Sequence, residues 1–432
     1  MDRLLRRFTI AALLSSAVAS LSSAEPLRWW KGNLHTHSLW SDGDDYPEMI
    51  CEWYRSRGYH FLALSDHNII ADHERWIGIE KSSGGLLAFD KYVAHFGKPW
   101  VEEREVDGNR QVRLKTLSDF QSRFEEPGRF LLFAAEEITD GFLRAPVHVN
   151  VTNVRELIKP QGGESVLEVL QNNVNAVIEQ RARTGVPMFP HINHPNFGWG
   201  ITAEELAEVE HAQFFEVYNG HPSVNNEGDA THASVDRAWD IALTQRMTRG
   251  LPPFFGLATD DSHHYHEKGP VTKESRPGRG WVMVRAAALT PEALIAAMEA
   301  GDFYATSGVM LKEVRREGAT LSLEIHAERG VNYRTEFLGT RKGYDPASEP
   351  VLSASGQTLR ATRRYSSDIG ATLATIEGAS ASYVLRGDEL YVRARVTSSK
   401  VKIGSSVAGE FERAWTQPLR GGVAPEESAK SR

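Results

Sequence analysis

The sequence predicts an α/β protein in which a βα barrel precedes a smaller region of β-strands. Between 29 and about 308, short apolar runs alternate with amphipathic segments, a pattern typical of repeated strand–helix units. Histidines and carboxylates follow several of these runs, and the loops at that end of the strands form the functional face of a βα barrel. Beyond 308 the pattern changes to strand-like runs and polar turns, with a single histidine, His326.

The strands of the predicted barrel are short apolar runs bounded by turn residues. We expect them at 31–34, 61–64, 130–134, 147–151, 187–190, 214–217, 254–258 and 281–284. Helices with an amphipathic pattern are expected at 46–58, 166–183, 239–247 and 291–300. The connections 68–129 and 221–250 are longer than a βα loop requires. Each is interpreted either as an elaboration that shapes a pocket at the barrel mouth or as solvent-facing decoration, and whether 68–129 acts as a lid stays open.

The C-terminal region is predicted to be a small β-sandwich that covers 309–418. Strand-like runs at 321–326, 335–338, 381–385, 390–396 and 401–403 are separated by polar turns. A disordered tail is expected at 419–432, where glycine, proline and charged residues dominate.

Residues 1–24 have the composition of a secretory signal peptide. Arg3, Arg6 and Arg7 precede an apolar stretch, 8–21, that is too short to span a bilayer, and small residues at 22–24 offer a cleavage site. The expected location of the mature chain is therefore the periplasm or the outside of the cell. A short membrane anchor or a buried helix is the alternative interpretation of this stretch.

The bulk composition suits one large domain with a smaller one. The chain has 432 residues, of which 41% are hydrophobic, and this is enough to bury a sizeable core. Its net charge of −8 argues against a nucleic-acid groove that depends on overall positive charge. Cys51 is the single cysteine, so the chain cannot form an internal disulfide.

Imidazoles and carboxylates that can bind metals gather near the ends of the predicted strands. The candidate ligands are His35, His37, Asp42, His67, Glu137, His148, His194, Asp261 and His263. Residues two apart in an extended segment share a face, so His35 and His37 point to the same side. The mixture suits Zn²⁺, Mn²⁺ or Fe²⁺ and does not suit a structural zinc site built from thiolates. Because a carboxylate can bridge two ions, a centre with several metals is favoured.

In chain order, these motifs resemble the polymerase and histidinol phosphatase (PHP) superfamily. The matching segments are His35-Thr36-His37, Ser41-Asp42-Gly43, Asp66-His67, Glu137-Ile138, His148, His194-Pro195 and Asp261-Ser262-His263, and they cover about 29–308. The resemblance implies a distorted seven-stranded βα barrel with two or three divalent metal ions, held by the candidate ligands. Glu137 is preferred to Glu136 because an apolar residue follows it, as in the family pattern, and Asp261 is preferred to Asp260 because it keeps the Asp-x-His spacing. Segments 278–281, 300–308 and 414–418 also resemble exported members related to carbaryl hydrolase.

The function predicted from these residues is hydrolysis of phosphoester bonds, mono- or diester, in small organic phosphates. A metal-bound hydroxide would attack the ester, Arg279 would clamp the phosphate, and His221 would protonate the leaving group. The expected partner is a small-molecule ester, with no nucleic acid, and no membrane once the signal peptide is removed. The oligomeric state stays open. His191, His264 and His266 are interpreted either as residues that support the site or as ordinary structural histidines.

Other functions fit parts of the same pattern. The metals can equally polarise a carbonyl, so a metal-dependent carbamate or carboxyl ester hydrolase is the second interpretation. A metal- or ligand-binding module without activity is the third, although every ligand type is present. DNA proofreading is the fourth, and the predicted signal peptide argues against it. The native metal and the ester class are not determined by the sequence.

Overall fold

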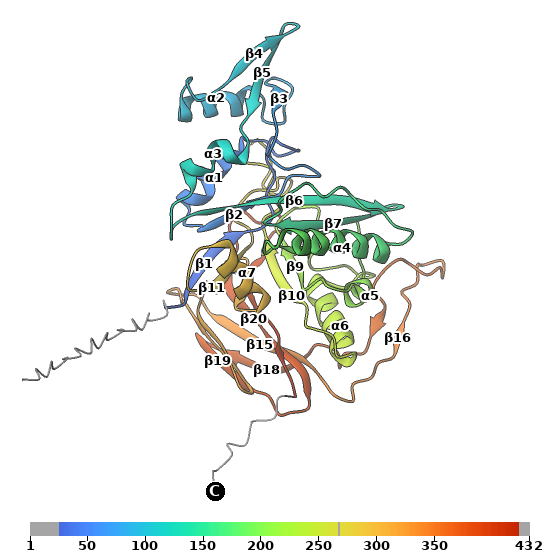
Figure 1. Ribbon diagram of the computed structural model, residues 1–432. Coiled ribbons are helices and arrows are strands. Elements are labelled where there is room, and N and C mark those ends of the chain that lie inside the picture. Colours follow the sequence, from blue (N-terminus) through green and yellow to red (C-terminus); the bar gives the residue numbers. More distant parts are fainter. Residues whose placement is uncertain (1–25, 267, 423–432) are drawn as a thin grey trace, which may run out of the picture.

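The computed structural model describes residues 26–266 and 268–422 (Figure 1). The predicted signal peptide at 1–24 and positions 423–432 of the predicted tail lie outside the described residues. Within the described part of the chain, no helix is both long enough and apolar enough to cross a membrane.

The fold is mixed α/β, as the sequence predicts, and one large sheet runs through it. Its strands are β1 (Arg28–Asn33), β2 (Phe61–Leu64), β6 (Leu131–Phe142), β7 (Ala145–Thr152), β8 (Phe189–Ile192), β9 (Phe214–Asn219), β10 (Phe255–Thr259), β11 (Trp281–Ala286), β12 (Phe303–Thr306), β15 (Tyr333–Arg341), β18 (Ala371–Glu377), β20 (Glu389–Val401), β21 (Phe411–Thr416) and β22 (Leu419–Arg420). They pair in the order β10-β9-β8-β7-β6-β2-β1-β11-β12-β21-β20-β15-β18, and β22 pairs with β20.

The described part of the chain contains seven helices. They are α1 (Pro47–Ser56), α2 (Gly85–Phe96), α3 (Leu117–Phe124), α4 (Val166–Thr184), α5 (Ala203–Glu208), α6 (Val235–Thr248) and α7 (Pro291–Glu299). Local chemistry sets their ends. The hydroxyl of Ser165 accepts the backbone N–H of Glu168 at the start of α4, and Gly185 ends that helix with φ 68°. Ser234 caps α6 in the same way, so α6 begins earlier than the predicted 239.

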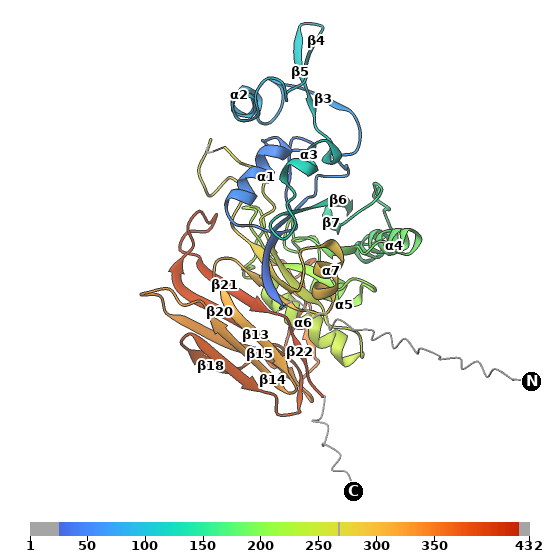
Figure 2. The same ribbon diagram turned by 60° about the vertical axis from the view of Figure 1, so that its left-hand side comes forward.

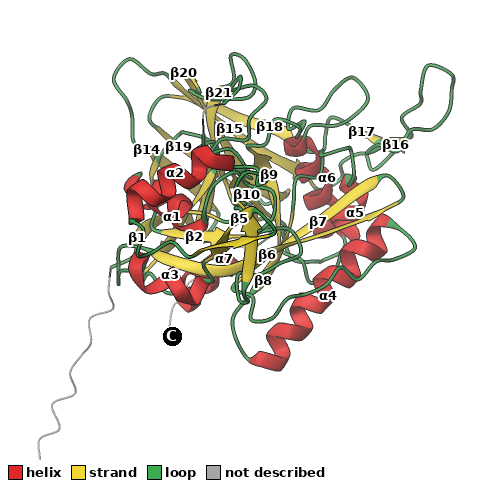
Figure 3. Ribbon diagram, turned by 90° about the horizontal axis from the view of Figure 1, so that it is seen from above, coloured by secondary structure: helices red, strands yellow, loops and turns green. Residues whose placement is uncertain are grey.

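Strand direction differs from a uniform βα repeat. The pairs β1–β2, β2–β6, β8–β9 and β9–β10 are parallel, whereas β6–β7, β7–β8 and β1–β11 are antiparallel. The runs predicted at 130–134 and 147–151 are longer than expected and form a hairpin that turns at Leu143, where φ is 54°. Seen from above, these two long strands run side by side with α4 next to them (Figure 3). As a result, Glu137 and His148 lie inside strands and do not follow them.

The C-terminal strands continue the large sheet. β12 pairs with β11 on one side and with β21 on the other. A separate three-stranded sheet, made of β13 (Leu311–Glu317), β14 (Thr320–Ile325) and β19 (Ser380–Val384), packs on this part of the large sheet (Figure 2). Leu323, Phe337 and Val396 belong to the shared apolar core. The predicted tail is corrected at its start, because Leu419 and Arg420 pair with β20.

The segment 68–129, named here the inserted segment, has secondary structure of its own. It contains α2, α3 and a sheet of β3 (Arg75–Gly78), β5 (Asn109–Leu114) and β4 (Glu103–Val106), and it projects at the top of the molecule (Figure 1). Phe89 and Tyr92 of α2 pack with Trp40 and Tyr46 from the loop after β1. The inserted segment therefore stands on the loop that follows His37. A short two-stranded sheet, β16 (Ser348–Glu349) and β17 (Arg364–Tyr365), lies in the C-terminal region.

A buried ion pair joins α6 to β20. Arg393 donates from Nε and Nη2 to the two carboxylate oxygens of Asp240, at 2.8 and 2.6 Å. The guanidinium also lies 4.4 Å from the ring centroid of Trp239. Arg393 is 0% and Asp240 4% exposed, so water cannot replace either partner. Nη2 of Arg393 lies 2.6 Å from Asp236 as well. Removing Arg393 therefore leaves the buried carboxylate of Asp240 without a cationic partner.

Arg393→Met is therefore expected to destabilise the protein by about 3–5 kcal/mol. The urea concentration at the midpoint of unfolding, followed by circular dichroism, measures this loss. Lys312→Met is the matched control, because Lys312 and Glu324 form an ion pair that is 63% and 51% exposed, and such pairs contribute about 0–1 kcal/mol. Equal shifts of the midpoint in the two variants would contradict a special role for the buried pair.

Candidate metal centre

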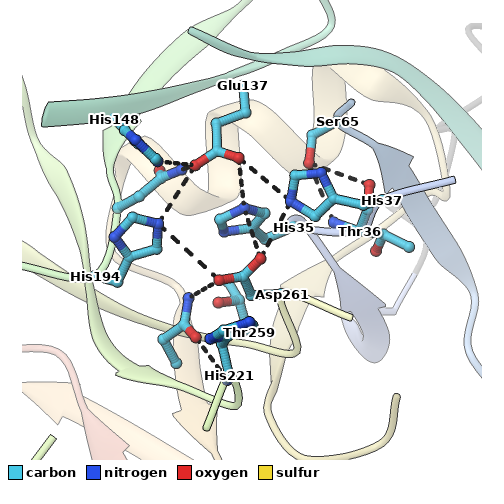
Figure 4. Close-up of polar contacts among 12 residues, drawn as sticks. His35, Thr36, His37, Ser65, Glu137, His148, His194, His221, Thr259 and Asp261 are labelled. Carbon is cyan, nitrogen blue, oxygen red and sulfur yellow. Dashed lines mark hydrogen bonds and ion pairs between the residues drawn. The ribbon is translucent and has the colours of Figure 1, made fainter. Parts of the chain in front are cut away.

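The structure brings all the candidate metal ligands together. Figure 4 shows His35, His37, Glu137, His148, His194 and Asp261. They form overlapping groups whose ligand atoms lie within 4.8 Å of one another: His37, Asp42, His67 and His263; His35, His194 and Asp261; His35, His37 and Glu137; and His67, Glu137 and His148. These groups share members, so they make one continuous cluster, named here the metal cluster. Nearly all its side chains are buried.

Backbone hydrogen bonds hold the loops of the metal cluster against one another. The N–H of His37 donates to the carbonyl of Ser262 at 3.0 Å, and the N–H of Asp261 donates to the carbonyl of His35 at 3.0 Å. On the other side, the N–H of Glu137 donates to the carbonyl of Asp66 at 3.1 Å. The ends of β1 and β10 are thereby tied to each other, and the end of β2 is tied to the middle of β6, which fixes where their side chains point.

Glu137 lies in the middle of the metal cluster. Its Oε2 is 3.3 Å from Nε2 of His35 and 3.3 Å from Nε2 of His37. Its Oε1 is 2.9 Å from Nδ1 of His148 and 3.4 Å from Nε2 of His194. Oε2 also lies 2.8 Å from Nδ1 of His67. The two oxygens therefore face different sets of imidazoles, which would suit a carboxylate shared by two ions.

Two aspartates complete the metal cluster. Oδ1 of Asp261 lies 3.3 Å from Nε2 of His35 and 3.1 Å from Nε2 of His37. Oδ1 of Asp42 lies 3.4 Å from Nε2 of His263. The side chain of Asp42 is 57% exposed, whereas that of Asp261 is 7% exposed. Asp42 therefore marks the side on which the metal cluster meets solvent.

The structure also separates the neighbouring carboxylates that the sequence left side by side. Successive side chains of a strand point to opposite faces, so Glu136 points away from the metal cluster and accepts the N–H of Ile158 at 2.8 Å. Asp260 is buried as well, and it accepts the N–H groups of Arg279 and Gly280 at 2.6 and 2.8 Å. Asp260 thus anchors a loop. Asp261 has φ 48°, a strained backbone value that turns the chain between the two aspartates.

Several ligand atoms of the metal cluster are buried without a hydrogen-bond partner. These are Nε2 of His35, both ring nitrogens of His37 and Oε2 of Glu137. Buried polar atoms in folded proteins nearly always have a partner, so these atoms require one. Two ligand atoms about 2.1 Å from one tetrahedral ion lie about 3.4 Å apart, close to the separations around Glu137. The residues present therefore fit divalent cations.

The charge states also favour a cation. Burial by itself would raise the pKa of Glu137 and of Asp261, but the surrounding imidazoles hold both pKa values well below the usual range. Burial, together with the nearby His263 and His67, lowers the pKa of His37 to about 3. The carboxylates are therefore ionised and the imidazole of His37 is neutral at neutral pH, as metal binding requires. Against the effect of burial, the same carboxylates raise the pKa of His35, His194 and His263, and that of His67 to about 9. A cation that binds to these four imidazoles would therefore displace protons.

Glu216 supports the metal cluster, and the sequence analysis missed it. Nδ1 of His35 donates to Oε1 of Glu216 at 2.7 Å, which directs Nε2 of His35 toward Glu137 and Asp261. The other carboxylate oxygen accepts the backbone N–H of His194 at 2.8 Å. The sequence signal that could have identified Glu216 is its charge in the middle of the buried, mostly apolar strand β9. His191 lies in a further buried group with His35 and Glu216.

Asparagine side chains hold other members of the metal cluster. Asn193 donates to Oε1 of Glu137 at 2.7 Å, and Asn219 donates to Oδ2 of Asp261 at 3.1 Å. Both follow or precede a predicted motif residue, but an amide carries no metal-ligand signal by itself. Such partners orient ligands and are as much a part of a metal site as the ligands are.

His221 borders the metal cluster. Its ring centroid lies 5.4 Å from that of His263. Its Nδ1 accepts the backbone N–H of Ser223 at 3.1 Å, so the proton of the neutral ring sits on Nε2. The position agrees with a group that acts on a molecule bound at the metal cluster.

The predicted role of Arg279 is corrected. Arg279 is 1% exposed, and its guanidinium donates to the carbonyls of Gly404, Gly220 and Val271 at 2.9, 2.8 and 2.8 Å. These contacts use the donors that a phosphate would need. Arg279 therefore clips the loop before His221 to the C-terminal region and does not face the metal cluster.

His264 and His266 have structural partners. Nδ1 of His264 accepts the N–H of Ser275 at 3.0 Å, and Nε2 of His266 donates to the carbonyl of Asp44 at 3.1 Å. Neither histidine belongs to the groups that make up the metal cluster.

Comparisons with known proteins give only remote similarities. No protein-family model and no curated protein matches the chain. Among solved structures, the chain is similar to a two-domain protein of Bacteroides vulgatus that contains a predicted PHP-like metal-dependent phosphoesterase, at 14% identity and a TM-score of 0.38, over 91% of this chain and 96% of the other. It is also similar to a proposed metal-dependent phosphoesterase of Bifidobacterium adolescentis, at 13% identity and a TM-score of 0.28, over 55% of this chain and 90% of the other. Similarities this remote leave the function to be argued from the site itself.

Glu216→Gln is expected to weaken binding of Zn²⁺ or Mn²⁺ by about 10–100-fold, because the carboxylate that orients His35 loses its charge. Titration of the metal-free protein against a chelator of known affinity measures the change. Glu210→Gln, which alters an exposed carboxylate just before the same strand, is expected to bind metal like the unaltered protein. If metal affinity falls equally in both variants, or falls in neither, Glu216 does not act through His35.

Proposed function

We propose that this chain is an exported metal-dependent hydrolase that cleaves phosphoester bonds in small organic phosphates. Residues 29–308 then form a distorted seven-stranded barrel of the PHP kind, which carries two or three divalent ions, and 309–418 form a β-sandwich beside it. The observation that carries the proposal is the set of buried imidazole and carboxylate atoms that have no hydrogen-bond partner and lie close enough together to share a cation. Export to the periplasm or the medium rests on the signal-like composition of 1–24.

The metal cluster supports hydrolysis more directly than any other chemistry. Bound divalent ions lower the pKa of a water molecule to about 7 and neutralise charge on phosphoryl oxygens. The ligand set keeps ionised carboxylates and imidazoles close together without a thiolate, which excludes a purely structural zinc site of the cysteine type. Access is from the side of Asp42, the exposed carboxylate. A small ester can reach the ions there while the rest of the site stays buried.

His221 is the residue proposed to protonate the leaving group. Its Nδ1 is occupied by the N–H of Ser223, so its Nε2–H is the group that donates a proton. Burial, offset in part by Asp261, lowers the pKa of His221 to about 4. The ring is therefore neutral at neutral pH, and its Nε2–H would share its proton with the leaving oxygen through a hydrogen bond as negative charge develops there. This matters most when the leaving group is a strong base.

A carbamate or carboxyl ester hydrolase is the second candidate. The contacts of Arg279 favour this second candidate. Arg279 is the arginine predicted to hold a phosphate, and its guanidinium donates to backbone carbonyls instead. The same ions would polarise a carbonyl as readily as a phosphoryl oxygen.

The purified protein, reconstituted with Mn²⁺ or Zn²⁺, is expected to hydrolyse 4-nitrophenyl phosphate or bis(4-nitrophenyl) phosphate. His194→Ala is expected to lower kcat/KM at least about 100-fold, because it removes a metal ligand, whereas His95→Ala on the exposed face of α2 leaves it unchanged. Turnover of 1-naphthyl N-methylcarbamate alone would replace the proposal by the second candidate. A protein that binds metal but hydrolyses none of these esters would be a metal-binding module.

His221→Gln is expected to lower kcat by about 100-fold on an alkyl phosphate such as propyl phosphate. On 4-nitrophenyl phosphate the loss is expected to be less than about fivefold, because nitrophenolate leaves without a proton. Steady-state kinetics with both esters measures the difference, and His95→Gln is the control. Equal losses on the two esters would assign His221 a role other than proton donation.

A further inference from the structure

A pocket of about 450 Å³ opens beside Asp42, at the exposed edge of the metal cluster. One wall comes from the loop after β1 and includes Ser41 and Asp42 itself. The opposite wall comes from the inserted segment, where Arg75, Lys81 and Ser83 line the space. The lining of the pocket therefore combines the carboxylate of Asp42, a candidate metal ligand, with two cationic side chains. A substrate bound at the metals would extend into this space.

Arg75 and Lys81 lack charged partners. Within 26–266 and 268–422, neither forms an ion pair, and Nε of Arg75 is buried without a hydrogen-bond partner. The nearest aromatic face to the guanidinium of Arg75 is Trp40, at 5.9 Å from the ring centroid. A buried donor without an acceptor costs free energy, so an acceptor supplied by a ligand would stabilise Arg75.

Two neighbouring cations of the inserted segment behave differently. Arg110 lies 3.0 Å from Glu103, and Arg113 lies 2.8 Å from Glu102. Both arginines lie on β5 and neither lines the pocket. Lys98, Arg104 and Arg123 of the inserted segment also form no ion pair within the described residues. Arg75 and Lys81 differ from these three cations because they line the pocket beside Asp42.

The cationic wall is held in place against the metal cluster. The hydroxyl of Ser83 donates to the carbonyl of Gly43, next to Asp42. Gly84 approaches so closely that an added Cβ would stand 2.4 Å from the carbonyl oxygen of Asp44. The turn that carries Lys81 therefore has a fixed position relative to the loop that carries Asp42.

We propose that this pocket is an anion subsite and that the substrate carries a second acidic group, a carboxylate or a phosphate, remote from the ester that is cleaved. A guanidinium binds either group through paired hydrogen bonds, and an ammonium adds a point charge. Because the net charge of the chain is −8, a dianionic substrate needs local cations to approach. This inference rests on the proposed function, and it assigns substrate selection to the inserted segment.

The test compares binding of phenylphosphonate with that of 3- and 4-carboxyphenylphosphonate, which cannot be hydrolysed. Calorimetric titration of the full, metal-loaded protein gives each Kd. We expect one of the carboxylated compounds to bind at least tenfold more tightly than phenylphosphonate. Arg75→Ala/Lys81→Ala is expected to abolish this preference, and Lys98→Ala, the same charge change at an exposed position of the inserted segment, is expected to keep it.

Two outcomes would overturn the inference. Equal Kd values in the unaltered protein would exclude a second acidic group at this pocket. An equal loss of affinity for all three compounds in the double variant would place Arg75 and Lys81 at the scissile group instead. Lys81→Ala alone is the control for a folding defect in the double variant, because Lys81 is exposed. It is expected to lose part of the preference for the carboxylated compounds. A preference that persists in a protein without esterase activity would overturn the proposed function and leave the anion subsite standing.

Discussion

Burial of several carboxylates and imidazoles in one place is the constraint on which the rest of this structure depends. Glu137 and Asp261 are ionised in a region that water hardly reaches, and the nitrogens of His35 and His37 that face them have no proton-sharing partner of good geometry. Charges buried in this way are stable only when they are paired or bound to metal. The metal cluster is therefore suited to binding cations.

The fold meets this constraint by tying the ligands to rigid elements. Strand ends are joined across the site by backbone hydrogen bonds, such as those between His37 and Ser262. Glu216 then fixes the orientation of His35, and Asn193 that of Glu137, through side-chain hydrogen bonds. A site held in this way needs little rearrangement when ions bind, because its polar partners are already in place.

The C-terminal region contributes to the same end. It is not a separate appendage, since β21 pairs directly with β12. Arg279 reaches from the loop after Asp261 to the carbonyls of Gly220 and Gly404. This contact links the loop before His221 to the β20–β21 connection, so damage to the C-terminal strands would also displace a residue beside the metal cluster.

Local chemistry in the sequence determined much of what is seen. The alternation of apolar runs predicted the α/β class, the positions of most strands and the long helix after Ser165, because periodicity and caps act over a few residues. The histidine and carboxylate motifs identified the cluster, since each motif carries its ligand types within a short segment. The conclusion that a metal is needed came from those residue types as well.

Tertiary structure alone decided the rest, because these features depend on contacts between distant segments. The hairpin that places His148 inside a strand follows from pairing between β6 and β7. Whether Glu136 or Glu137 faces the site depends on the register of that strand. In the sequence, Arg279 between two glycines resembles a residue that binds phosphate. In the structure, its guanidinium donates to backbone carbonyls of other loops. The pocket at Arg75 likewise exists only because the inserted segment folds back onto the loop of Asp42.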